Sequence, residues 1–101
     1  MGEVTDPNPL PTFDDVSAAS SRIADGIFHT PCFEAPALSE RCGCTVFTKD
    51  EHLQRTGSFK ERGARNALML LNKDAKKRGA IAASAGNHAM ALAHHGRELG
   101  I

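Results

Sequence analysis

The sequence contains no tryptophan and no tyrosine, and five phenylalanines are its whole aromatic content. Side chains that could stack on bases are therefore scarce. The 12 basic and 12 acidic side chains cancel, and no basic stripe remains that would bind nucleic acid or an anionic membrane surface. No apolar run approaches the length of a transmembrane helix. We therefore expect neither nucleic acid nor a membrane as a partner.

Cysteine is also scarce. Cys32, Cys42 and Cys44 form an odd set with a C-x-C spacing, which predicts neither a disulfide framework nor a zinc knuckle. Reduced thiols are typical of a reducing compartment. The first residues, MGEVTDPNPLPT, have neither the basic start nor the apolar stretch of a signal peptide. These features favour a cytoplasmic protein.

The 101 residues provide material for one small domain at most. Turn residues and apolar periodicity divide the chain into short segments. We expect a flexible leader over 1–12, a helix within 13–27, extended chain over 29–35, a short helix from Pro36 to a C-cap at Gly43, a strand over 44–49, a helix over 58–72, a charged and partly helical connection over 73–79, a buried strand over 80–84, and a helix over 86–100 with Gly100 as its C-cap.

The order strand, helix, strand, helix from residue 44 onward predicts an α/β fold with a parallel sheet and flanking helices. Two such units cannot cover both faces of a parallel sheet. We therefore expect the chain to be the N-terminal part of a longer protein.

Lys60 lies at an unusual place for a lysine. Ser58 and Glu61 have the S-x-x-E spacing of a capping box, so Lys60 is expected in the first turn of a helix, where the dipole disfavours a cation by about 0.3–1 kcal/mol. One interpretation is a solvated lysine that tolerates this cost. The other is an uncharged amine, which is the form that makes an imine with a carbonyl cofactor.

The stretch SAGNH, residues 84–88, follows the second expected strand and leads into a helix. Unpaired N–H groups at a helix start can bind an anion such as a carboxylate, and Asn87 adds an amide. The alternative is that Ser84 and Asn87 only cap the helix. In open parallel sheets, ligands bind beyond the carboxyl ends of the strands, which would bring this loop and Lys60 to one edge.

The stretches LQRTGSFKERGARN and ASAGNHA together resemble the two N-terminal signatures of the threonine/serine dehydratases, which are pyridoxal-phosphate enzymes of fold type II. The resemblance extends over residues 13–101 and implies that they form the N-terminal part of the catalytic domain, with its parallel sheet. It also implies pyridoxal 5'-phosphate as cofactor, a small amino-acid substrate, a homo-oligomer at full length, and a place in amino-acid metabolism such as isoleucine biosynthesis.

The resemblance also implies roles for individual residues. Lys60 would hold the cofactor as the Schiff-base lysine and carry the proton at the substrate Cα. Phe59 would pack against the cofactor ring, and Asn87 would donate to its phenolic oxygen. The loop that takes the substrate carboxylate would consist of Ser84, Ala85, Gly86, Asn87 and His88.

Three positions compare this sequence with individual groups of enzymes within the family that it resembles. His88 stands where cysteine-synthase-like members usually show threonine. Ala85 stands where racemases of the family place a second serine, the acid/base on the opposite ring face, so its methyl group favours elimination over racemisation. Met90 departs from the glutamine of many relatives. We expect dehydration and deamination of L-threonine or L-serine to a 2-oxo acid and ammonia; the alternatives are a serine racemase-like enzyme and a non-catalytic fragment of the fold.

Two further expectations concern what the chain does not provide. His88 and His95 share a helix face near His94, but no third ligand is evident in the sequence, so no metal site is expected. The family's glycine-rich phosphate loop has no counterpart in these 101 residues. We therefore expect this chain alone to be inactive.

Overall fold

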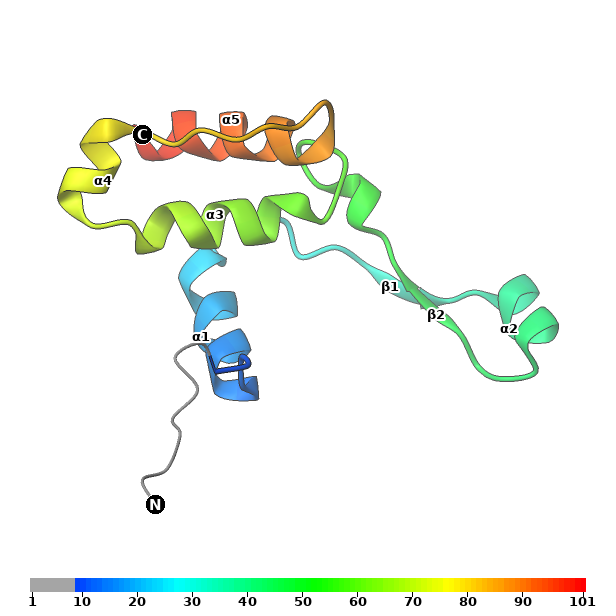
Figure 1. The fold of residues 1–101 in the computed structure, drawn as a ribbon. Helices are drawn as coiled ribbons and strands as arrows, with labels where there is room; N and C mark the ends of the chain where they lie inside the picture. The colour runs from blue at the N-terminus through cyan, green and yellow to red at the C-terminus, as the bar shows by residue number, and fades with distance from the viewer. Residues whose placement is uncertain (1–8) are drawn as a thin grey trace, which may run out of the picture.

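The computed structural model describes residues 9–101, so residues 1–8 of the expected leader lie outside the described part. Its elements in chain order are α1 (Phe13–Ile23), β1 (Cys32–Glu34), α2 (Pro36–Cys42), β2 (Phe47–Lys49), the 3-10 turn η1 (Glu51–Leu53), α3 (Lys60–Leu70), α4 (Lys73–Arg78) and α5 (Asn87–Leu99). Figure 1 shows their arrangement.

Several helix ends follow from local sequence. Helix α2 has Pro36 in its first turn and ends at Gly43, whose φ of 66° is left-handed. Helix α5 ends at Gly100 with φ 69°, so both glycine C-caps are confirmed. Helix α1 begins with a capping box that we did not predict, in which Thr12 and Asp15 bind each other's backbone N–H groups.

The predicted capping box at the start of α3 is wrong. The helix begins at Lys60, and Phe59 is its N-cap. The hydroxyl of Ser58 accepts from the N–H of Lys60 at 3.3 Å. The carboxylate of Glu61 does not reach back to Ser58, because it accepts from the N–H and the hydroxyl of Thr56 instead.

The sheet of residues 9–101 differs from the prediction. It has two strands, β1 and β2, which pair antiparallel with Phe33 opposite Thr48. The strand predicted over 44–49 thus takes an earlier segment as its partner, one connected to it only by α2. The strand predicted over 80–84 is not formed; Ile81 is 98% exposed, and no neighbouring strand is available to it among these residues.

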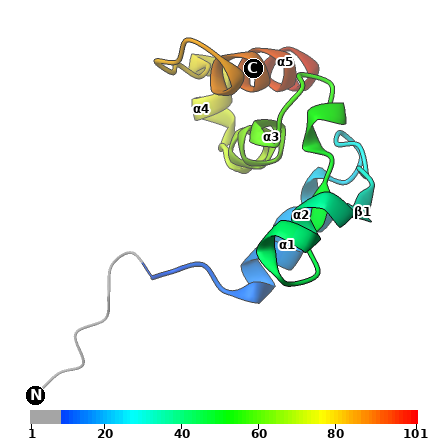
Figure 2. The same cartoon turned by 90° about the vertical axis from the view of Figure 1, so that its right-hand side faces the viewer.

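The core lies where α3 packs between α5 and α1, as both views show (Figures 1 and 2). Its buried apolar side chains are few, and two of the four are alanines: Ile23, Ala64, Leu68 and Ala91. Helices α3 and α5 run in the same direction, and both begin at the same end of the pair (Figure 1). The two loops that lead into these helices therefore lie at the same end of the helix pair (Figure 1).

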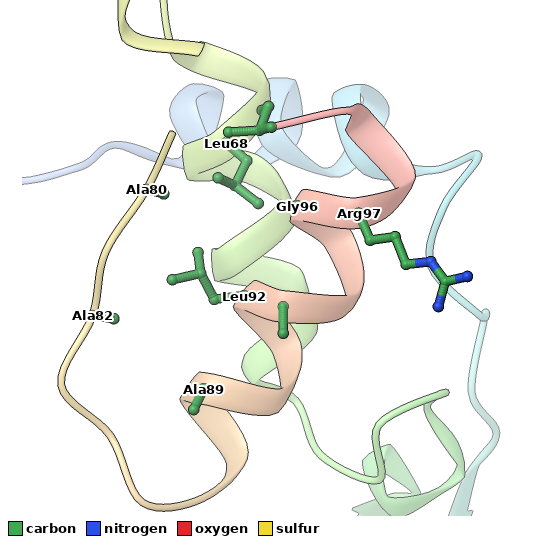
Figure 3. A pocket seen from close by; sticks show the side chains of 9 residues that line it. Leu68, Ala80, Ala82, Ala89, Leu92, Gly96 and Arg97 are labelled. Carbon is green, nitrogen blue, oxygen red and sulfur yellow. The ribbon is translucent and has the colours of Figure 1, made fainter. Parts of the chain in front are cut away.

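Beside this pair, the extended stretch before α5 leaves an open hollow of about 240 Å³. Figure 3 shows Ala80 and Ala82 on one side of it and Leu68 and Leu92 on the other. In the described part of the chain, no helix has both the length and the apolar composition needed to cross a membrane.

Candidate active site

Lys60 is an exposed side chain at the first position of α3. Its ammonium nitrogen lies 5.5 Å from the ring centroid of Phe59, and that ring is 61% exposed. Among the described residues, no carboxylate pairs with the amine of Lys60. The amine is therefore open to a ligand at the start of the helix.

The loop 84–88 is exposed along its whole length. The hydroxyl of Ser84 accepts from the N–H groups of Gly86 and Ala89, each at 3.3 Å, so this serine binds the first turn of α5, whose N-cap is Gly86. Within residues 9–101, the N–H groups of Asn87 and His88 have no protein acceptor. They are the free donors that a helix start offers to an anion.

A hollow of about 310 Å³ connects the two helix starts. Lys60 and Phe59 line it from α3, and His88 lines it from α5; its other lining residues are Gly63, Ala64, Ala67 and Leu92. The structure thus brings together three of the predicted site residues. Ser84, Ala85, Gly86 and Asn87 do not line this hollow, although Asn87 is the immediate neighbour of His88.

A buried polar network, which the sequence analysis missed, includes the residue that follows Lys60 in sequence. Glu61 and His95 are both fully buried, and Oε1 of Glu61 lies 2.9 Å from Nε2 of His95. Arg65 on α3 lies 3.4 Å from the other ring nitrogen, Nδ1, and also binds Glu98 and Asp25. The available signal was helical spacing, since Glu61, Arg65 and Leu68 share one face of α3.

The network lowers the pKa of two of its members, His95 and Glu61. Burial lowers the pKa of His95, although Glu61 opposes this effect. Burial alone would raise the pKa of Glu61, but hydrogen bonds from Thr56 and His95 outweigh it and lower the pKa overall. Because the guanidinium of Arg65 can only donate to Nδ1, Nε2 of a neutral His95 carries the proton that it donates to Glu61.

Glu61, His94 and His95 bring three potential ligand atoms within 4.8 Å of one another. This cluster does not include His88, which the sequence analysis had paired with His95, and Glu61 was not considered there as a ligand. In the network, however, Nε2 of His95 and Oε1 of Glu61 already bind each other, so neither atom is free to bind a metal ion. The Arg65 cation beside the ring would also oppose a metal ion. The arrangement is that of a hydrogen-bonded link between α3 and α5.

The family model described as "Pyridoxal-phosphate dependent enzyme" matches residues 23–101. The chain belongs to this family. It is 43% identical to the L-threo-3-hydroxyaspartate ammonia-lyase of Saccharomyces cerevisiae over 84 residues, which are 83% of this chain and 26% of that protein. It is 44% identical to the catabolic L-threonine dehydratase of Escherichia coli K12 over 88 residues, 87% of this chain and 27% of that protein.

Among solved structures, the serine racemase of maize matches with a TM-score of 0.79 and 34% identity, over 88% of this chain and 28% of that one. The fold is therefore that of the fold-type-II pyridoxal-phosphate enzymes. The chain spans about a quarter of the length of the relatives it matches. These relatives carry three different names for their reactions, so similarity in this region does not select one reaction.

Members of this family depend on pyridoxal phosphate, and the residues present fit this group. The chemistry requires a lysine amine that is free to react with an aldehyde. Lys60 is exposed, and within residues 9–101 it pairs with no carboxylate. The hollow beside it has an aromatic ring, Phe59, and small side chains along α3, which leave room for a planar ring.

Proposed function

We propose that the whole protein is a pyridoxal-phosphate-dependent ammonia-lyase that dehydrates and deaminates L-threonine or L-serine. The observation that carries the proposal is the shared hollow of Lys60 and His88, where an open amine and the start of an anion-binding helix lie side by side. Such a site can accept an amino acid whose carboxylate binds at α5 while its Cα lies near the lysine.

Each residue has a distinct task in this proposal. Lys60 would hold the cofactor, release it to the incoming amino acid and take the Cα proton with its amine. The bound cofactor supplies an electron sink for the electron pair that this proton leaves behind. Phe59 would pack on the ring, and Asn87 would donate a hydrogen bond to its phenolic oxygen.

The loop 84–88 would bind the substrate carboxylate. The free N–H groups of Asn87 and His88 point to this task, because a helix start stabilises negative charge. The rest of the carboxylate-binding loop would consist of Ser84, Ala85 and Gly86. The hydroxyl of Ser84 holds this loop against α5 by accepting from the N–H of Ala89. Loss of the β-hydroxyl as water, followed by hydrolysis, then yields a 2-oxo acid and ammonia.

The preference for elimination rests on Ala85. A methyl group can neither donate nor accept a proton, so reprotonation on the opposite face lacks a donor at this position.

The proposal also includes a homo-oligomer at full length and a place in the cytoplasm, as predicted from the sequence.

The test is a product assay on the whole protein with added cofactor. We expect L-threonine to yield 2-oxobutanoate and ammonia in equal amounts, and L-serine to yield pyruvate, with little D-serine. Lys60→Ala should abolish product formation. Lys73→Ala is the matched control, since Lys73 is also an exposed lysine at the first position of a helix. D-serine as the main product from L-serine would favour the racemase instead.

A further inference from the structure

The first turn of α3 is fixed by a side chain adjacent to Lys60 in sequence. The two carboxylate oxygens of Glu61 serve different parts of the chain. Oε2 accepts from the N–H and the hydroxyl of Thr56, in the loop before the helix. Oε1 pairs with Nε2 of His95 on α5. One buried carboxylate therefore connects the loop that precedes Lys60 to a second helix.

Lys60 itself has little that would fix its place. Its side chain is exposed, and its N–H makes one long hydrogen bond, 3.3 Å, to Ser58. The position of its Cα is thus set by the neighbouring backbone. The start of α3 also lacks a side-chain cap, so the bonds of Glu61 replace the usual anchor of a helix start.

His95 is held firmly enough to act as an anchor. It is fully buried, and its ring lies between Glu61 and Arg65, which are one helical turn apart on α3. Arg65 is in turn bound to Glu98 and to Asp25, which follows α1. Movement of the ring would disturb contacts to α1, α3 and α5 together.

We propose that the buried Glu61–His95 pair is a positioning device for Lys60, which fixes the lysine relative to α5 and the loop 84–88. This inference rests on the proposed role of Lys60. His95 touches neither cofactor nor substrate; it acts through Glu61. Since the lysine must meet both the cofactor and the substrate Cα, a displacement of about 1 Å can cost on the order of 100-fold in rate.

The decisive variant is His95→Phe, which fills the site of the ring but donates no hydrogen bond to Glu61. His94→Phe is the matched control, because His94 is the preceding residue and its Nε2, 3.6 Å from Glu98, makes no hydrogen bond to Glu61 among the described residues. His95→Gln is the conservative variant, since its amide can still donate to the carboxylate. Should His95→Phe fail to fold, Glu61→Gln tests the link from the other side, because an amide has one acceptor oxygen and cannot accept from both Thr56 and His95.

Two measurements on the whole protein decide the matter. The first is hydrogen–deuterium exchange of the peptide that contains Thr56 and Lys60, in the absence of cofactor. We expect it to rise about tenfold or more in His95→Phe and Glu61→Gln. It should stay near the wild-type rate in His94→Phe and His95→Gln. Unchanged exchange in folded His95→Phe and folded Glu61→Gln overturns the inference, whatever the enzyme does with its cofactor.

The second measurement is the rate at which added pyridoxal phosphate develops its yellow lysine adduct, well below the unfolding temperature. A purely structural role would lower the unfolding temperature and leave this rate unchanged, and that result also overturns the inference. We expect a loss of about tenfold or more in His95→Phe, with recovery in His95→Gln. Absence of an adduct at Lys60 in the wild type would refute the proposed function, while the exchange experiment would still test the link.

Discussion

The guanidinium of Arg62 binds the carboxylate of Glu51 through two parallel hydrogen bonds, each 2.8 Å long. The pair connects α3 to η1, and Glu51 also accepts from the hydroxyl of Thr30. These contacts connect η1 and the residue Thr30, which precedes β1, to the helix that begins with Lys60. A bidentate pair of this kind is both oriented and sensitive to pH.

The first prediction concerns acid stability. The hydrogen bonds from Arg62, with help from Thr30, lower the pKa of Glu51 from 4.5 to about 2. Because the folded pKa is the lower one, the unfolded state takes up the proton first. The stabilisation is therefore full above about pH 4.5 and is lost as the pH falls towards 2.

Arg62→Gln should accordingly lower the free energy of unfolding of the whole protein by about 1 kcal/mol at neutral pH, with allowance for solvent around the pair. The loss should shrink as the pH falls below 4.5, as measured by urea unfolding. Arg22→Gln is the control, because Arg22 binds the neutral amide of Asn66. An equal loss for Arg62→Gln at all pH values would contradict this account.

The sequence predicted the helices better than the sheet. Pro36, Gly43 and Gly100 act on their own backbone, so the ends of α2 and α5 could be located from local signals. Strand pairing depends on partners that are distant in the chain. The segment 44–49 contains β2 as predicted, but its partner, β1, could not be chosen from periodicity. The parallel sheet remains a prediction for the whole protein.

In the candidate site, too, local features could be predicted from the sequence and contacts between distant residues could not. Lys60 and the loop 84–88 could be predicted as site residues because each signature is continuous in sequence; their roles stay predictions. The link between Glu61 and His95 joins residues 34 positions apart. The S-x-x-E spacing even suggested a different partner for Glu61. In a capping box the carboxylate of Glu61 would accept from the backbone N–H of Ser58. In the structure its two oxygens are bound to Thr56 and His95 instead.

The second prediction concerns Ala85. If its methyl group is what prevents reprotonation on the opposite face, Ala85→Ser should increase D-serine formation from L-serine, because a hydroxyl can carry the proton. Chiral chromatography of the products measures this directly. Ala37→Ser is the control, an equal change at an exposed position in α2. Unchanged D-serine with elimination intact would show that Ala85 does not determine the reaction.

The third prediction concerns residues 1–101 as an isolated chain. Few apolar side chains are buried, whereas Ile81 is 98% exposed, Phe13 83% and Phe33 64%. Such a core is too small to offset a conformational entropy cost of about 1–2 kcal/mol per residue. We expect no cooperative thermal transition by circular dichroism and no turnover of threonine. A sharp transition with measurable 2-oxobutanoate would contradict this expectation.

The central claim is that Lys60 carries the cofactor, and borohydride reduction of the holoenzyme followed by peptide mass mapping tests it most directly. Reduction fixes the cofactor on the amine that holds it. We predict the added mass on the peptide that contains Lys60, its disappearance together with the yellow colour in Lys60→Ala, and its retention in Lys73→Ala. Cofactor found on a different lysine, or a yellow Lys60→Ala protein with the adduct still present, would contradict the account.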